Sequence, residues 1–263
     1  FNGGDPFKRA KWRMLAGINF KQVRMIDGSG NKKPYGDTTP TTGNNNEIIC
    51  VGYSPKDGSC PTENTLVSFV SSTSRNNLNN GTNPTSGNKF TLGSEQFFSV
   101  GNSSPTFNRL RSTYSFFIPT KLLNLTKECR AEDFSNAACP QTVGIQFKTG
   151  TIIGELPPYE AFCMGGTSSV RGWGSCDLSV SRSFVEGTAE YRFPVWKMLS
   201  GALFVDAGTD LGSQNDVPGK PGKLLKKSGS GFSVGGGVGV KTPIGPLRLD
   251  AASKDLSGDW RYT

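Results

Sequence analysis

The chain has 263 residues, 34% of them hydrophobic, and its 29 basic and 21 acidic side chains give a net charge of +8. No stretch approaches the roughly 18 apolar residues of a membrane helix, which excludes helical spans but not the alternating strands of a membrane barrel. Histidine, the commonest general base and metal ligand, is absent. This disfavours an enzyme, although carboxylate or lysine chemistry stays open, and we expect no catalytic residue, no metal and no cofactor.

The dominant periodicity along the chain is two, which is typical of strands with one apolar and one polar face. It predicts ten strands, at about 11–25, 65–75, 88–100, 108–119, 143–154, 182–195, 199–208, 231–242, 246–254 and 259–263. In the clearest of them the odd positions are apolar or small, and the even positions include Glu186, Thr188, Glu190 and Arg192. The pattern therefore predicts an all-β fold.

The gaps between the predicted strands alternate between long and short. Long gaps lie at about 26–64, 155–181 and 209–230, whereas 242–246 is a tight turn bracketed by prolines. The segment around Cys129 and Cys139 is long where a short turn is expected. This pattern fits a soluble β-sandwich or a transmembrane antiparallel barrel, and aromatic residues near the strand ends favour the barrel because they form interfacial girdles.

Six cysteines fall into neighbouring pairs along the chain: Cys50 with Cys60, Cys129 with Cys139, and Cys163 with Cys176. We expect neighbours to form disulfides because each pair lies in or beside a predicted loop, although other connectivities stay open. The wide spacings and the missing histidines argue against zinc. Disulfides imply an oxidising compartment, such as a periplasm or a cell surface.

A glycine-rich run at 165–174 is the most ordered loop sequence of the chain. It reads Gly-Gly-Thr-Ser-Ser-Val-Arg-Gly-Trp-Gly, with Cys163 and Cys176 on its two sides. Glycines near Arg171 let the backbone turn sharply and pack closely. The run predicts a loop that positions one guanidinium group, although an arginine beside a glycine is more often simply exposed.

From about Pro157 to Ser253 the chain resembles the BamA-like outer-membrane assembly family, also called the bacterial surface antigen family. The loop at 170–173 matches the family's Val-Arg-Gly-aromatic signature. The other matching strings are Asn-Pro-Thr-Ser-Gly at 83–87, Pro-Pro-Tyr-Glu-Ala-Phe at 157–162, Ala-Glu-Tyr-Arg-Phe-Pro at 189–194, Phe-Val-Asp-Ala-Gly-Thr-Asp-Leu-Gly at 204–212, Ser-Gly-Phe at 230–232 and Thr-Pro-Ile-Gly-Pro-Leu-Arg-Leu-Asp at 242–250. The double proline, the 204–212 string and 217–222 are most similar to the cyanobacterial and chloroplast outer-envelope branch.

The resemblance covers roughly residues 65–263, and 26–64 match no part of the family. It implies the C-terminal part of a transmembrane antiparallel barrel, about ten of the family's sixteen strands. Residues 1–263 would then all belong to the barrel, with 155–181 as a surface loop that folds into the lumen. The chain starts at Phe1 without a methionine, so we expect a fragment that lacks the first strands and the periplasmic repeat domains. Ten strands alone would leave two unpaired edges in lipid.

The resemblance also implies that the loop arginine reaches acidic residues on the inner barrel wall, as a structural latch and not as a catalyst. The latch would consist of Val170, Arg171, Gly172 and Trp173. Asp206 is the first choice of partner because it lies on the inward phase of its strand, and Glu190 is the second. The charged residues assigned to a solvated wall are Glu186, Arg192, Arg109 and Arg111. A Cys163–Cys176 bridge would be a departure from the family pattern, with free thiols as its alternative.

The implied function is an outer-membrane barrel that inserts other barrels or passes polypeptides across the membrane. Its partners would be unfolded outer-membrane or translocated polypeptides, outer-membrane lipid and accessory assembly subunits. Nucleic acid is not expected, because no basic cluster is interleaved with aromatic residues. The alternatives are a two-partner secretion transporter of the same superfamily, a passive porin, and a soluble or surface β-sandwich adhesin. The expected location is the outer membrane of a Gram-negative or cyanobacterial cell, ahead of the chloroplast outer envelope.

Overall fold

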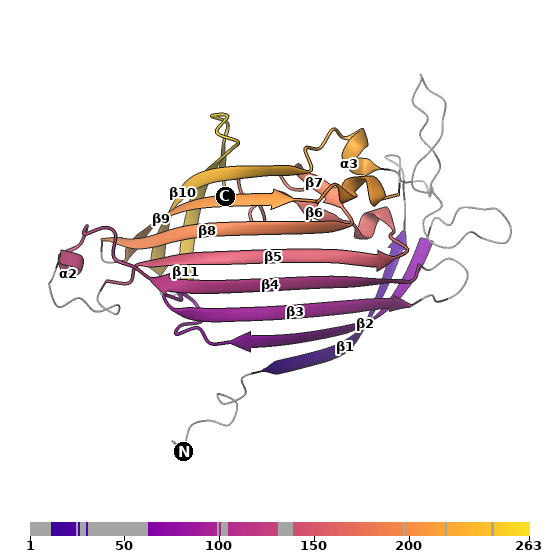
Figure 1. Ribbon diagram of the computed structural model, residues 1–263, viewed down its shortest axis with the longest axis horizontal. Helices are drawn as coiled ribbons and strands as arrows, with labels where there is room; N and C mark the ends of the chain where they lie inside the picture. The colour runs from indigo at the N-terminus through magenta and orange to yellow at the C-terminus, as the bar shows by residue number, and fades with distance from the viewer. Residues whose placement is uncertain are drawn as a thin grey trace, which may run out of the picture.

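The computed structural model describes residues 12–24, 26, 30, 63–98, 100, 105–130, 139–196, 198–218, 220–242 and 245–263. Ten strands form one antiparallel sheet in chain order (Figure 1). They are β1 (Arg13–Arg24), β2 (Glu63–Asn76), β3 (Gly87–Phe98), β4 (Phe107–Pro119), β5 (Thr142–Gly154), β8 (Ser183–Trp196), β9 (Leu199–Thr209), β10 (Ser230–Thr242), β11 (Gly245–Lys254) and β12 (Trp260–Tyr262). All ten predicted strands are present, and their ends lie within two residues of the prediction.

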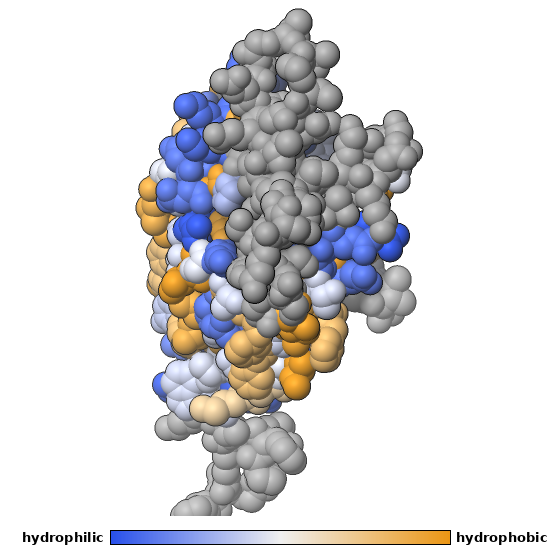
Figure 2. All heavy atoms as spheres, turned by 90° about the vertical axis from the view of Figure 1, so that its right-hand side faces the viewer, coloured by the Kyte–Doolittle hydropathy of each residue, from blue (hydrophilic) through white to orange (hydrophobic). Residues whose placement is uncertain are grey.

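The two faces of the sheet carry opposite kinds of side chain. On β9, Leu203 and Val205 are 56% and 48% exposed on one face, whereas Asp206 is 1% exposed on the other. Seen from the right-hand side of Figure 1, hydrophobic side chains gather in the lower part of the molecule (Figure 2). An apolar outer face and a polar inner face are typical of the wall of a transmembrane barrel. The large strands form a single curved sheet (Figure 1), so the two-sheet sandwich is not the fold.

The strands end at two mouths that differ in their connections. At one end, residues 155–182 join β5 to β8, and we call this end the loop mouth. At the other end, 77–86 join β2 to β3 and 120–141 join β4 to β5, and we call it the turn mouth. The pairing of Pro119 with Thr142 and of Asn76 with Lys89 aligns the strand ends there. Each residue in these connections therefore lies at a known end of the barrel wall.

Several short elements lie between the strands. The hairpin of β6 (Phe162–Met164) and β7 (Ser179–Ser181) stands inside the predicted loop at 155–181. The helical turns are α2 (Lys127–Arg130), η1 (Pro158–Glu160), η2 (Ser213–Asp216) and α3 (Pro221–Leu224). None was predicted, because elements of three or four residues are too short to show a periodic pattern. No helix in the described part of the chain is long and apolar enough to cross a membrane.

The connection at 77–86 folds inward at the turn mouth. The Asn79 side chain holds its shape by accepting a hydrogen bond from the backbone N–H of Thr85 at 3.0 Å. Arg192 on β8 donates through Nη1 to Oδ1 of Asn83 at 3.0 Å, and the Thr142 hydroxyl donates to the Thr85 carbonyl at 3.1 Å. The connection is therefore tied to strands on the other side of the concave face.

The structure contains a disulfide at each mouth. Cys129 is joined to Cys139 in the β4–β5 connection, and Cys163 is joined to Cys176 in the loop between β5 and β8. Both are neighbouring pairs along the chain. Cys50 and Cys60, the third expected pair, lie outside the described residues. The long connection on the turn side is thus cross-linked between Cys129 and Cys139, which limits its conformational freedom.

Candidate functional site

The loop at 155–181 packs against the polar inner face of the sheet. Its first limb contributes Leu156 and Phe162 to a buried apolar cluster with wall residues of four strands, β2, β3, β4 and β5, and one residue of the β9–β10 connection. The other buried members of this cluster are Leu66, Phe97, Phe107, Ile152 and Val217. A second, smaller cluster is made by Met164, Val170 and Leu178, all within the loop. Burial of these side chains provides the driving force that holds the loop against the wall.

The tip of the loop turns back on itself through glycines. Gly165 has φ of 108°, and a Cβ there would lie 2.3 Å from the carbonyl oxygen of Gly174. The N–H of Gly166 donates to the carbonyl of Trp173 at 3.0 Å, and that of Trp173 donates to Val170 at 3.1 Å. This tight turn explains why glycine recurs here, because a side chain at Gly165 would meet backbone.

Arg171, at this tip, is the centre of a buried ion cluster. Its Nε and Nη2 donate to Oδ2 and Oδ1 of Asp206 at 2.7 and 2.8 Å, a bidentate contact, and its backbone N–H donates to Oδ2 at 3.2 Å. Nη1 donates to Oε2 of Glu190 and Oδ2 of Asp250, both at 3.0 Å. Three strands, β8, β9 and β11, thus meet at one guanidinium, and planar bidentate geometry gives the contact its direction.

A second arginine balances the cluster. Arg248 on β11 donates to both oxygens of Glu190 at 2.7 and 2.8 Å and to Oδ1 of Asp250 at 2.6 Å. The three carboxylates therefore face two guanidinium groups, with Arg192 3.6 Å from Glu190 as a further cation. Because unpaired buried charge is strongly unfavourable, this arrangement needs both arginines.

The environment of Arg171 favours its charged form. Burial by itself lowers the pKa of the guanidinium, but the hydrogen bonds and charge of Asp206 and Glu190 outweigh burial and raise the pKa. The guanidinium carbon also lies 3.3 Å from the centroid of the Phe204 ring. Arg171 stays cationic at any physiological pH, so it has no proton to exchange and acts through position and charge.

The residues beside Arg171 fix its backbone. A Cβ on Gly172 would lie 2.7 Å from both the backbone N of Lys254 and Cβ of Ser233, so this segment lies directly on β10 and β11. The Trp173 ring N–H donates to the carbonyl of Phe232 at 3.1 Å. On the other side the Ser169 hydroxyl donates to Glu186, a carboxylate that the sequence pattern assigned to a solvated wall. Glu186 is buried and not solvated, because the loop passes over it and covers it.

The structure brings Arg171 together with both expected partners, Asp206 and Glu190. It adds three residues that the sequence pattern did not single out, Asp250, Arg248 and Phe204. Asp250 and Arg248 lie two residues apart on one strand and face the same side. The alternation along β11 was the sequence signal that could have identified them as inward-facing. Arg109, also assigned to the solvated wall, contacts the loop residue Glu160. Arg111 lies on β4, with its guanidinium carbon 5.2 Å from the Phe162 ring centroid.

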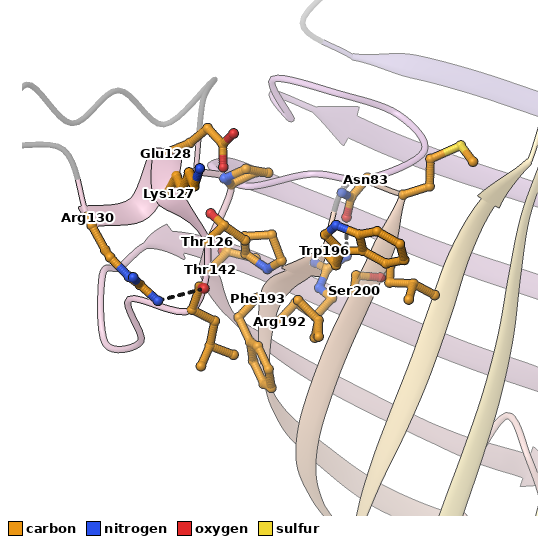
Figure 3. Close-up of a pocket in the computed structure, with 16 residues that line it drawn as sticks. Asn83, Thr126, Lys127, Glu128, Arg130, Thr142, Arg192, Phe193, Trp196 and Ser200 are labelled. Carbon is orange, nitrogen blue, oxygen red and sulfur yellow. Dashed lines mark hydrogen bonds between the residues drawn. The ribbon is translucent and has the colours of Figure 1, made fainter.

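Two cavities lie near this cluster. A groove of about 760 Å³ at the turn mouth lies between α2 and the ends of β8 and β9, where Lys127, Arg130 and Trp196 line it (Figure 3). A smaller cavity of about 350 Å³ lies between the loop tip and Pro84, beside Arg171. In the described part of the chain, no group of three or more His, Cys, Asp or Glu side chains could hold a metal ion. The site is the packed ion cluster and not either cavity.

Removing the Cys163–Cys176 bridge is expected to loosen the loop. The bridge closes a ring of sequence separation 13. Replacing both cysteines with serine gives the undocked loop more conformational freedom, which makes docking less favourable by about 3 kcal/mol. Protease nicking of the loop in the detergent-solubilised protein measures this change, and the double serine variant should be cut faster. Cys129→Ser with Cys139→Ser is the matched control. Equal nicking of the two variants and the parent would contradict the expectation.

Residues 3–259 match the family model described as the Omp85 superfamily domain. "Outer envelope protein 80, chloroplastic" of Arabidopsis thaliana is 46% identical over 106 residues, 40% of this chain and 14% of the relative. "Protein TOC75-4, chloroplastic" of the same plant is 35% identical over 156 residues, 59% of this chain and 36% of the relative. "Protein TOC75, chloroplastic" of Pisum sativum is 34% identical over 179 residues, 68% of this chain and 20% of the relative.

The crystal structure of BamA from Haemophilus ducreyi lacking POTRA domains 1-3 matches the fold. The TM-score is 0.64 and the sequence identity 15%, with 95% of this chain and 50% of that chain covered. At this identity the match concerns the fold alone. The chain spans half of that structure and well under half of the three curated relatives above.

Proposed function

This chain belongs to the Omp85 superfamily, and from that premise we propose that it forms part of an outer-membrane barrel that inserts or translocates polypeptides. Residues 1–263 would be the C-terminal portion of that barrel, and 155–181 its lumen-folding loop. Substrates would be unfolded outer-membrane or translocated polypeptides, with accessory assembly subunits and lipid as further partners. The location would be the outer membrane of a Gram-negative or cyanobacterial cell, ahead of the chloroplast outer envelope.

The observation that carries this proposal is the docking of Arg171. A passive channel needs no buried cluster of one loop arginine and four charged residues on three strands to hold a loop inside its lumen, because such a cluster contributes little net stability. What it provides is one defined arrangement of loop and wall. Val170, Gly172 and Trp173 complete the latch by fixing the backbone around the guanidinium. The latch would hold the barrel in one state, and release of the loop would permit another.

The proposed activity also requires a wall that substrate strands can join. Strand edges offer unpaired N–H and C=O groups, and polypeptides pair with such edges by strand addition. The described sheet has β1 and β12 at its two edges. An insertion or translocation channel would use such an edge while the latch holds the rest of the wall in one arrangement.

The test uses the full-length protein in lipid vesicles, with an unfolded outer-membrane barrel protein as the substrate. We expect the vesicles to fold this substrate several times faster than vesicles that contain an equal mass of an ordinary porin. Folding is read from heat-modifiable migration on gels, and translocation from protection of the substrate against external protease. Ion conductance with neither activity would favour the passive porin and overturn the proposal.

A further inference from the structure

We propose that Glu160 is a second anchor of the loop, which fastens it to the opposite flank of the barrel wall from Arg171. The idea deepens the proposed function, on which it rests, by assigning a positioning role to Glu160 and to the cations that receive it. The loop would then be a brace across the lumen, held at both ends, and not a hairpin fixed at its tip alone.

Glu160 is buried and doubly paired. Its side chain is 4% exposed, and it accepts hydrogen bonds from Nζ of Lys21 on β1 and from Nη2 of Arg109 on β4. The same Nη2 of Arg109 donates to the backbone carbonyl of Glu160 at 3.0 Å. A carboxylate with two cationic partners meets the condition under which a charge can stay buried. Arg109 therefore fixes the position of Glu160 through both its backbone carbonyl and its side chain.

The wall residues that bind Glu160 also contact one another. Nη1 of Arg109 lies 3.4 Å from Oε2 of Glu95 on β3, and its guanidinium carbon lies 5.5 Å from the Phe97 ring centroid. Glu95 in turn accepts a hydrogen bond from the Ser68 hydroxyl on β2 at 2.8 Å. Two contacts from β3 therefore orient Arg109, and β2 supports one of them through Glu95, which makes Arg109 a fixed partner and not a mobile surface arginine.

Tyr159, beside Glu160, adds a polar contact to the same flank. Its hydroxyl accepts a hydrogen bond from Nδ2 of Asn64 on β2 at 2.7 Å. Burial raises the pKa of this phenol to about 12, so it stays neutral at physiological pH. The apolar cluster around Leu156 and Phe162 lies directly next to it. The limb at 156–162 is thus docked by packing, by hydrogen bonds and by charge.

The two anchors have opposite polarity. At 171 the loop brings a cation to an acidic wall on β8, β9 and β11, whereas at 160 it brings an anion to a basic wall on β1 and β4. Like charges would meet if either limb slid into the place of the other, which is unfavourable. This polarity fixes where along the lumen the loop can lie. It also links β1, an edge strand of the described sheet, to β11 at the far side.

The test compares Glu160→Gln with Glu155→Gln in the full-length protein. Glu155 is the matched control, because it stands in the same loop but is exposed and contacts the backbone N–H of Thr106 at 3.0 Å. Removing the charge at 160 leaves Lys21 and Arg109 without their shared partner. In planar lipid bilayers we expect Glu160→Gln to raise the frequency of channel openings about tenfold, since the lost ionic contact shifts the docking equilibrium by that order. Glu155→Gln should match the parent.

A charge reversal separates an ionic anchor from simple packing. Glu160→Arg alone and Arg109→Glu alone should each open the channel or prevent folding. A variant that combines both changes with Lys21→Glu and Glu95→Gln, so that no like charges meet, should restore closure and heat-modifiable folding at least in part. If this combined variant behaves no better than the worse single variant, the proposal is overturned. The proposal is also overturned if the Glu160→Gln channel opens no more often than the Glu155→Gln channel.

Assembly activity of Arg171→Ala distinguishes this failure from failure of the proposed function. Lost assembly with Arg171→Ala and unchanged gating with Glu160→Gln would leave the function standing and remove only the second anchor. Normal assembly with Arg171→Ala, together with frequent openings with Glu160→Gln, would support the anchor and contradict the latch at the tip.

Discussion

Replacing Arg171 with alanine in the full-length protein should release the loop tip and abolish most of the assembly activity, while the barrel still folds. The substitution leaves Arg248 as the main cation of Glu190 and Asp250, and it removes the guanidinium that Asp206 binds. Removing one partner of a buried ion pair costs about 3–5 kcal/mol, and even about 3 kcal/mol lowers a docking equilibrium more than a hundredfold. We therefore expect at least a tenfold loss of activity in the vesicle assay.

Lysine at 171 should recover only part of this loss. It restores the charge but not the planar fork that holds both oxygens of Asp206. Arg24→Ala is the matched control, because Arg24 also pairs with a carboxylate, that of Glu63 at 2.7 Å, yet its side chain is 58% exposed. Exposed pairs contribute about 0–1 kcal/mol, so this variant should be as active as the parent. Normal levels of outer-membrane proteins in a strain that carries only Arg171→Ala would refute the latch.

Gly172→Ala is expected to lift the same loop tip without removing any charge. The added methyl group would lie 2.7 Å from the backbone N of Lys254 and from Cβ of Ser233, and 2.9 Å from the carbonyl carbon of Ser253. These atoms belong to paired strands of the wall and cannot give way, so the loop must move. Overpacking of this kind costs about 1–3 kcal/mol, and here it also lengthens the contact between Arg171 and Asp206.

The measurement is the rate of protease nicking within 155–181, together with assembly activity. The nicking rate and the assembly activity of Gly172→Ala should both approach those of Arg171→Ala, although Gly172→Ala keeps every charged side chain. Gly17→Ala provides the control, because a Cβ at that strand position meets no atom within 4 Å. If Gly172→Ala docks its loop like the parent, close seating of the tip on β10 and β11 plays no part in the latch.

The strands could be predicted from the sequence because lipid and lumen impose a period of two on every one of them. Val185 and Glu186, adjacent on β8, illustrate this, since one is exposed on the outer face and the other is buried on the inner face. The ten strands were found for this reason. The β6–β7 hairpin was not, because its three-residue strands face the loop and the wall, and no uniform environment patterns them.

The candidate site could be predicted only in part, because the alternation along a strand shows which of its residues face inward and nothing more. Asp206 was chosen because it faces inward, and phase alone cannot say which inward residues of other strands curve toward the same point. Asp250 and Arg248 are on β11, two strands from β9 in the sheet, and only curvature brings them to Arg171. Glu186 and Arg109 were assigned to a solvated wall because their partners, Ser169 and Glu160, come from a loop whose path has no sequence signature.

The two disulfides have a consequence for the surroundings of the protein. Cys129–Cys139 closes a connection at the turn mouth, and Cys163–Cys176 lies in the loop that enters from the other mouth (Figure 1). In a barrel that spans a membrane these bridges stand toward opposite compartments. Glutathione and thioredoxin keep thiols reduced in a cytosol, so a membrane that borders the cytosol on one side would expose one bridge to reduction. A membrane with no strongly reducing compartment on either side would leave both bridges intact.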